Sequence, residues 1–530
     1  MTISATARPI GSKHRVRVNE LLAITVSALI SLALSAMPSI MGHVPRPAVH
    51  DEFAYLLQAD TFARGRLTNP PHELWEHFET FHVIQQPTYA GKFPPALGMA
   101  LAVGKLLGHP IIGAWLSTAL GCAATTWMML AFVPARWALL GGILIATAPT
   151  VHWWSQGYWG GGMAMTGGAL LGGAAGRIVK RPGPLLGVVV AVALAILANS
   201  RPFEGLILSV IVAALASAAL LKSDRLLVTA RSVLPAAILT LLPFLGLMAF
   251  YNWRVTGVAW RLPYVLHQTQ YMAAPLMWWQ QPRPAPDYRH DVMRRFHLVD
   301  EWDEYARQTT PAGFLTAAFE KVQMLIAGYL QGWALPLPLA VGALMIGRSR
   351  GARWMVIVCI ALPLIQIACT PWLRNHYLAP AIGFVYTLAA IGLRRIGLAR
   401  IHRVGTALVL CVVVVHICAG VSFSMGYAQS KKPPQGNLRQ SILEQFEQSD
   451  QGAKHLVIIH HGPTFSPVLD IMFNDADIDA SPIVFARDAG DAKNTELLRY
   501  FRDRRAWRLD IDIPRLVPLD FASGQPSNGN

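Results

Sequence analysis

The chain has 530 residues, of which 53% are hydrophobic and only 14% are charged. Soluble domains carry about 25% charged residues, so this composition excludes an ordinary soluble protein and predicts an all-α polytopic membrane protein. The net charge of +15 does not indicate nucleic-acid binding, because much of it lies in short basic loops between apolar segments, where it sets topology and attracts anionic membrane lipids.

The first elements are a short tail and a long series of apolar runs. Residues 1–19 are expected to be a cytoplasmic tail, because Lys13, Arg15 and Arg17 precede the first run. Residues 20–425 then contain about 11 to 13 expected membrane helices. One of the two short runs, 94–108 and 136–150, is expected not to cross fully. The basic loops place the two long loops, 43–92 and 252–320, on the outer face.

The end of the chain changes character. Three stretches, "HLVIIHH", "SPIVFAR" and "AWRLDIDIP", are typical of strands, and "NTELLRYFRDRR" is typical of a helix. This alternation predicts a small extracytoplasmic α/β domain over residues 426–522. Residues 523–530 are expected to be disordered.

Charged residues gather at the predicted outer face. Asp51 and Glu52 follow the first span, in a segment whose apolar residues predict an amphipathic helix lying in the membrane interface. Lys92 stands at the start of the next apolar run, and Arg201 and Arg374 lie in other outer loops. Each residue also has a simpler interpretation. The two acids fit ordinary solvated loop residues, and the lysine fits a side chain that snorkels to the interface. Arg201 fits an ion pair with a nearby acid, and the other arginine fits an interfacial anchor. The tryptophans of "WWSQGYW" fit an interfacial belt equally well.

Metal ligands are not predicted. The histidines of the first outer loop, His50, His72, His77 and His82, match no helical metal-binding spacing. All five cysteines lie in apolar segments, which indicates packing rather than a metal site or a disulfide framework.

Acids, cations and aromatic rings at one membrane face indicate a site for an amphiphile with an anionic headgroup. Cations can hold a phosphate, and aromatic rings can hold an apolar chain or a sugar. A central carboxylate can accept the proton of an incoming hydroxyl. This combination is the chemistry that moves a glycosyl group from a phospholipid carrier, whose phosphate must be stabilised as it leaves.

Three short motifs, in this order and topology, resemble the GT-C superfold of membrane glycosyltransferases. They are the acidic pair Asp51–Glu52, the "GKFPP" stretch with Lys92, and "RNHYLAP" with Arg374, Tyr377 and Pro380. The similarity is greatest to the bacterial branch of lipid A aminoarabinose transferases, protein O-mannosyltransferases and lipopolysaccharide sugar transferases. It covers roughly residues 20–425. Phe93 stands between the lysine and the prolines, whereas the commoner form of the motif is Lys-Pro-Pro. This departure bears on the identity of the donor and the acceptor more than on the class of enzyme.

The resemblance implies an inverting glycosyltransferase in the cytoplasmic membrane, without a cofactor, acting on its extracytoplasmic face. Its donor would be a polyprenyl-phosphate-linked sugar, and its acceptor a lipid, a glycan or a protein. Asp51 is the implied base, with Glu52 as its neighbour or substitute. The implied donor-phosphate residues are Lys92, Arg201, Arg374, His376 and Tyr377.

A transporter or flippase of a lipid-linked saccharide is the main alternative. Such proteins carry polar or charged groups at the membrane midplane and often contain inverted repeats. The apolar runs of this chain are nearly free of charge and show no repeat, which favours an enzyme.

Overall fold

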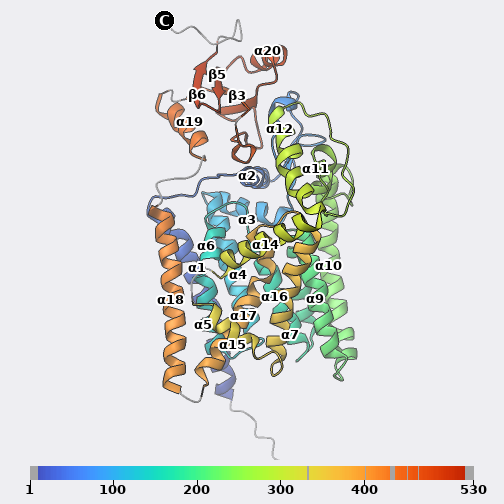
Figure 1. The fold of residues 1–530 in the computed structure, drawn as a ribbon, viewed down its shortest axis with the longest axis vertical. Coiled ribbons are helices and arrows are strands. Elements are labelled where there is room, and N and C mark those ends of the chain that lie inside the picture. The colour runs from blue at the N-terminus through green and yellow to red at the C-terminus, as the bar shows by residue number, and fades with distance from the viewer. Residues whose placement is uncertain are drawn as a thin grey trace, which may run out of the picture.

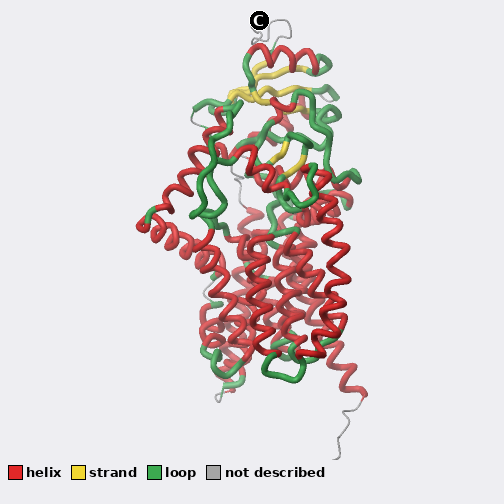
Figure 2. The backbone as a smooth tube through the Cα atoms, turned by 90° about the vertical axis from the view of Figure 1, so that its right-hand side faces the viewer, coloured by secondary structure: helices red, strands yellow, loops and turns green. Residues whose placement is uncertain are grey.

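The apolar segments fold into a bundle of long, roughly aligned helices, and the C-terminal residues form a small sheet stacked on one end of it (Figures 1 and 2). This arrangement, seen in the computed structural model, confirms the predicted fold class. The structure describes residues 10–330, 334–399, 402–429, 436–449, 452–463 and 465–519.

The helices of the bundle follow the predicted apolar runs. They are α1 (Ile10–Ile40), α3 (Pro95–Leu106), α4 (Pro110–Met129), α5 (Ala135–Ala146), α6 (Pro149–Ser155), α7 (Gly162–Ile178), α8 (Pro184–Ala198), α9 (Pro202–Leu220), α10 (Leu226–Thr256), α15 (Pro336–Ala343), α16 (Arg350–Cys369), α17 (Ala379–Gly397) and α18 (His402–Gln429).

Within the described ranges, seven helices are long and apolar enough to cross a membrane, compared with the 11 to 13 expected. Three further apolar helices, α3, α5 and α8, have only 12 to 15 residues. The predicted short runs 94–108 and 136–150 correspond to α3 and α5, each of 12 residues, and 12 residues span only about 18 Å of a ~30 Å hydrocarbon layer.

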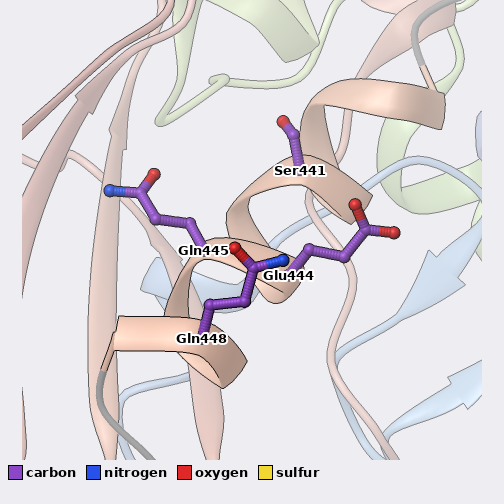
Figure 3. A pocket seen from close by; sticks show the side chains of 4 residues that line it. All are labelled: Ser441, Glu444, Gln445 and Gln448. Carbon is purple, nitrogen blue, oxygen red and sulfur yellow. The ribbon is translucent and has the colours of Figure 1, made fainter.

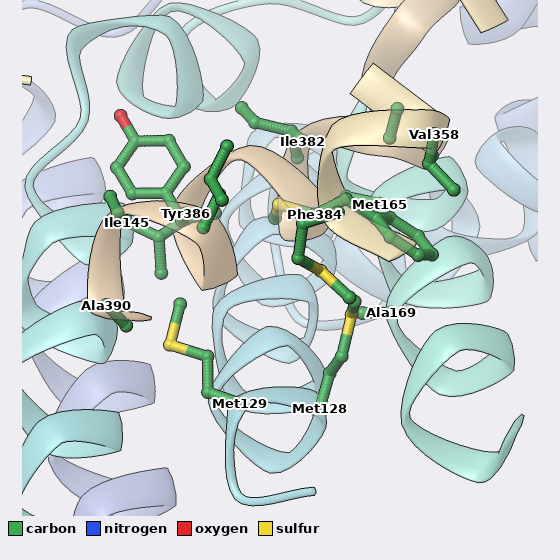
Figure 4. Close-up of a cluster of buried hydrophobic side chains, with 14 of the residues drawn as sticks. Met128, Met129, Ile145, Met165, Ala169, Val358, Ile382, Phe384, Tyr386 and Ala390 are labelled. Atoms are coloured by element: carbon green, nitrogen blue, oxygen red, sulfur yellow. The ribbon is translucent and has the colours of Figure 1, made fainter. Parts of the chain in front are cut away.

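The bundle core is apolar and contains many small residues. Met128, Met165 and Phe384 are completely buried at the contact of α4, α7 and α17 (Figure 4). Gly168 of α7 lies so near the start of α17 that a Cβ there would collide with the carbonyl oxygen of Pro380. Small residues allow helices in membranes to approach this closely. The contact fixes the end of α17 that immediately follows the "RNHY" segment.

Shorter elements cover one end of the bundle. The first long loop contains α2 (His50–Ala63), the 3₁₀ turn η1 (Trp75–Phe78) and a hairpin of β1 (Val83–Ile84) and β2 (Ala90–Gly91). The second contains α11 (Pro263–Tyr271), α12 (Asp291–Arg295), α13 (Glu301–Ala306) and α14 (Pro311–Tyr329). The 3₁₀ turn η4 (Asn375–Leu378) precedes α17.

The helix predicted after the first span is present as α2, but it does not lie against lipid as an interfacial helix would. It runs between the bundle and the C-terminal sheet (Figure 1). Ala54 and Leu57 of α2 are fully buried in one apolar core with Leu456 and Val484 of the sheet. The interfacial placement is therefore wrong, because the C-terminal residues cover the face that was expected to meet the membrane.

The C-terminal sheet has the strand order β4-β3-β5-β6. The strands β3 (His455–His460), β4 (Ile483–Arg487) and β5 (Arg505–Asp510) are parallel and correspond to the three predicted strands, and α20 (Asp491–Tyr500) is the predicted helix. The antiparallel β6 (Arg515–Pro518) and the helix α19 (Gly436–Ser449) were not predicted. The expected disordered end, 523–530, lies outside the described residues.

Candidate functional site

A cavity of about 640 Å³ is lined in part by His50 and Asp51 of α2. This helix lies at the end of the bundle that carries the C-terminal sheet (Figure 1). Six of the seven predicted site residues line the cavity: Asp51, Lys92, Arg201, Arg374, His376 and Tyr377. They come from segments far apart in the chain and converge because each precedes or begins a helix at the same end of the bundle. Asp51 lies in the first turn of α2, Lys92 follows β2, Arg201 precedes α9, and the last three lie at or beside η4.

Asp51 offers the cavity a carboxylate. Its side chain is 37% exposed, and its Oδ1 atom lies 3.1 Å from Nε2 of the buried His82. A partly exposed carboxylate can accept a proton from a group bound in the cavity.

Glu52 points elsewhere and does not line the cavity. Its carboxylate is buried and accepts hydrogen bonds from the backbone N–H groups of Ala48 (2.6 Å), Val49 (3.3 Å) and Tyr158 (2.8 Å). It therefore ties the start of α2 to the "WWSQGYW" segment. The placement gives Glu52 a structural role and leaves Asp51 as the candidate base.

Burial raises the pKa of Glu52 to about 7, although its backbone donors oppose the shift. The native state then binds the proton more tightly than the unfolded chain, so this stabilisation is complete below about pH 4.5 and is lost as the pH rises towards 7. We expect wild-type protein to lose about 2–3 kcal/mol of unfolding free energy over this interval relative to Glu52→Gln. Chemical denaturation in detergent micelles at several pH values measures it. The surface variant Glu447→Gln is the control and should follow the wild type.

Lys92 places a buried cation beside the cavity. Its side chain is 3% exposed and makes no ion pair or hydrogen bond within the described ranges. Its Nζ atom lies 4.8 Å from the ring centre of Tyr264. Burial lowers the pKa of Lys92, while Glu301 and Asp51 oppose the shift. An unpaired buried cation is costly, and an anion bound in the cavity would compensate it.

The two arginines are held differently. The guanidinium of Arg201 lies 4.2 Å from the ring centre of Tyr377, and among the described residues it has no ion pair with the nearby Glu204. A cation on an aromatic face keeps its charge available to a ligand. Arg374 is about half exposed and lies 3.4 Å from Glu304, an exposed contact of small energetic value that a phosphate could replace.

Aromatic rings form one side of the cavity. His376 stacks on Trp159 with ring centres 5.8 Å apart, and Trp153 lies against Trp159 at 4.8 Å. Both tryptophans line the cavity. The "WWSQGYW" segment thus supplies rings to the site, where flat faces suit a sugar ring or an isoprenoid chain.

Among the cavity residues to which the sequence analysis gave no site role are His82, Tyr264 and Glu301. His82 belongs to a histidine-rich loop, which was considered only for metal binding. The other two lie in the long 252–320 loop, where no pattern distinguishes them. Burial acts to raise the pKa of Glu301, but His297, whose Nδ1 lies 2.6 Å away, and Lys92 outweigh it and lower that pKa.

The residues that could hold a metal ion are His50, Asp51 and His82, whose ligand atoms all lie within 4.8 Å of one another. Two imidazoles and a carboxylate match the donor set of Zn²⁺ or a similar transition metal. The prediction that no metal is used stays a prediction.

A second hollow lies along α19 and is lined by Ser441, Glu444, Gln445 and Gln448 (Figure 3). All four side chains come from one surface helix, and Glu444 pairs with Arg46 at 3.0 Å. Its lining residues belong to this one helix, whereas residues from several distant segments line the cavity around Asp51, which is therefore the better candidate.

Comparisons with known proteins bear on the fold. No protein-family model matches the chain, and no curated protein has a significantly similar sequence. Among solved structures, ArnT from Cupriavidus metallidurans bound to undecaprenyl phosphate is 14% identical, with a TM-score of 0.53 over 93% of this chain and 89% of that one. Its apo state is 13% identical, with a TM-score of 0.53 over 92% of each chain.

The apo oligosaccharyltransferase from Archaeoglobus fulgidus is 11% identical, with a TM-score of 0.48 over 83% of this chain. The present chain spans 62% of that protein's length. Together with the helical bundle and the small sheet at its end, the match to ArnT shows that this chain has the fold of the GT-C membrane glycosyltransferases.

Proposed function

We propose that this protein is an inverting glycosyltransferase that moves a sugar from a polyprenyl-phosphate donor to an acceptor hydroxyl. The carrying observation is that one cavity contains both the half-exposed carboxylate of Asp51 and the unpaired ammonium group of Lys92. The shared fold with ArnT, solved with undecaprenyl phosphate, supports the class of donor. The positions of the basic loops support a cavity on the extracytoplasmic side of the cytoplasmic membrane.

In the proposed reaction, Asp51 takes the proton of the acceptor hydroxyl as its oxygen attacks the anomeric carbon of the sugar. The bond from that carbon to the phosphate oxygen breaks, and its electron pair leaves with the phosphate. Attack from the side opposite the phosphate inverts the anomeric configuration. Lys92, Arg201 and Arg374 stabilise the charge of the leaving phosphate, with hydrogen bonds from His376 and Tyr377. The acceptor is a lipid, a glycan or a protein.

The test uses purified protein in liposomes with undecaprenyl phosphate carrying radiolabelled mannose, glucose or aminoarabinose, and a cell-envelope extract as acceptor. We expect at least one donor to be cleaved, with free undecaprenyl phosphate formed and the label attached to the acceptor. NMR of the product should show the anomer opposite to that of the donor. Movement of intact donor lipid across the bilayer without cleavage would instead identify a flippase and overturn the proposal.

Lys92→Ala should weaken binding of undecaprenyl phosphate by about 10- to 100-fold, because a charge-assisted contact contributes about 1.5–3 kcal/mol. Binding can be measured by tryptophan quenching in detergent, since Trp153 and Trp159 line the same cavity. Lys105→Ala is the matched control: Lys105 pairs with Asp60 and does not line the cavity, so affinity should not change. Equal affinity of wild-type and Lys92→Ala protein would remove Lys92 from phosphate binding.

A further inference from the structure

A single turn of π-helix borders the cavity. It covers Phe296–Asp300, between α12 and α13, and is the only π-helical turn in the part of the chain that the structure describes. The N–H of Glu301 closes the turn by bonding to the carbonyl oxygen of Phe296. Such turns are rare and occur frequently at functional sites. The side chain that follows the turn, Glu301, lines the cavity, so we consider what its carboxylate does there.

The carboxylate of Glu301 is held at one oxygen only. Its side chain is 12% exposed, and Oε2 accepts a hydrogen bond from Nδ1 of His297, one helical turn earlier, at 2.6 Å. An ionised carboxylate has no proton to give, so the histidine is the donor. Within the described ranges, Oε1 makes no hydrogen bond and no ion pair. Removing a charged oxygen from water without a partner is costly, which indicates that a bound molecule supplies a donor to Oε1.

The hydrogen bond to Glu301 is the one polar contact of the His297 side chain among the described residues. Its imidazole is completely buried, and its Nε2 atom has no partner there. The ring stacks on Tyr271, with centres 6.1 Å apart, and on Tyr288, with centres 5.8 Å apart. The hydroxyl of Tyr288 donates to the carbonyl oxygen of Tyr271 at 2.7 Å, which ties the two tyrosines together. His297 does not line the cavity, so this fixed ring acts on the cavity through Glu301.

Glu301 and Lys92 line the same cavity, but among the described residues they form no ion pair. Their charges nevertheless act on each other: Glu301 opposes the lowering of the pKa of Lys92 more strongly than Asp51 does. Opposite charges that lie near one another without contact leave room for a ligand with an anionic part and hydrogen-bond donors. A sugar linked to a phosphate has both, because its phosphate oxygens suit an ammonium group and its hydroxyl groups suit a carboxylate.

We infer that Glu301 binds hydroxyl groups of the donor's sugar through Oε1, and that His297 is a positioning residue which holds Oε2. In this arrangement Lys92 holds the phosphate, and Glu301 distinguishes the glycosylated lipid from the bare lipid phosphate. The identity of the ligand rests on the proposed function, whereas the contact itself concerns binding and needs no turnover.

The test compares two lipids in the absence of acceptor: bare undecaprenyl phosphate, and undecaprenyl phosphate carrying mannose, glucose or aminoarabinose. Binding is measured by tryptophan quenching in detergent. Glu301→Ala should weaken binding of the best glycosylated lipid by about 10- to 100-fold, because a hydrogen bond to a charged group is lost, and should not weaken binding of the bare lipid. Glu301→Gln keeps an accepting oxygen without the charge and should lose only about 3- to 10-fold. Asp303→Ala is the matched control, since Asp303 is an exposed acid of the same helix outside the cavity lining.

Two substitutions of one size test the positioning contact. His297→Leu removes the donor, and His297→Asn keeps an N–H donor at about the position of Nδ1. Leucine and asparagine leave a similar gap between the tyrosine rings, so a difference between the two variants reports the hydrogen bond rather than the packing. We expect His297→Leu to weaken binding of the glycosylated lipid by about 3- to 10-fold, and His297→Asn to restore most of that loss.

The outcomes distinguish the two proposals. If the affinities change as expected but the wild type cleaves no donor, the sugar contact stands and the proposed function fails. The sugar contact is overturned if Glu301→Ala weakens binding of both lipids equally, or if it weakens binding of none of the glycosylated lipids. It is also overturned if donor affinity is unchanged while the KM for the acceptor rises, because Glu301 would then bind the acceptor. Equal losses in His297→Asn and His297→Leu would overturn the positioning role of His297.

Discussion

Asp51→Asn is expected to lower kcat for sugar transfer by about 100- to 10,000-fold, the contribution of a positioned general base. An amide has nearly the same shape as the carboxylate but cannot accept the proton. Asp51 is 37% exposed to the cavity, so the substitution should leave the melting temperature almost unchanged. The assay is release of undecaprenyl phosphate from the best donor, under donor saturation.

Glu52→Gln is the natural control, because Glu52 is adjacent in sequence but absent from the cavity lining. The glutamine has the size of the glutamate but no charge. The kcat of the Glu52→Gln enzyme should therefore stay within about threefold of the wild type, even where its stability changes. Full activity of Asp51→Asn would eliminate the carboxylate mechanism. A loss in Glu52→Gln equal to that in Asp51→Asn would mean that the wrong acid has been assigned.

Arg487→Met is expected to destabilise the protein by about 3–5 kcal/mol, the cost of leaving a buried charge without its partner. The guanidinium of Arg487 pairs with Asp470, and both side chains are at most 1% exposed. Arg487 also donates to the carbonyl oxygen of Glu79, and its own carbonyl accepts from Nδ1 of His77 at 2.9 Å. The residue therefore joins the C-terminal sheet to the first long loop.

The measurement is chemical denaturation in detergent micelles, with protease sensitivity of the first long loop as a local readout. Burial opposes ionisation of Asp470, but Arg487 and His461 hold its pKa well below the ordinary value. The stabilisation is thus present above about pH 4 and is lost as the pH falls through the native pKa. The double variant Arg487→Met, Asp470→Leu should recover part of the loss, because it leaves no unpaired charge. A single variant as stable as the wild type would contradict the structural role.

The contact at Arg487 also explains why the C-terminal sheet matters to the site. Tyr89 donates to the carbonyl oxygen of Asn474 at 2.9 Å, and Asp60 accepts the N–H of Ala476 at 2.8 Å. Val468 reaches the cavity itself. The first long loop, with Asp51, His82 and Lys92, is thereby fixed between the helical bundle and the sheet.

The sequence alone determined the features that depend on local pattern. Apolar runs and basic loops identified a polytopic membrane protein, because spanning length and loop charge are properties of contiguous residues. Short strand-like stretches and a helical pattern identified β3, β4, β5 and α20. The same topology placed Asp51, Lys92, Arg201 and Arg374 at one end of the bundle, where the cavity contains all four.

Only the tertiary structure decided what depends on distant contacts. Asp51 and Glu52 are neighbours in the chain, but the side chains of successive helical residues point about 100° apart. Only the tertiary structure shows that Glu52 is buried against the N–H of Tyr158, whereas Asp51 faces the cavity. The position of His82 required the hairpin on α2, and the burial of α2 required a sheet formed about 400 residues later. Such contacts join segments whose separation in sequence leaves no local pattern, so folding alone brings Asp51, His82 and Lys92 into one cavity.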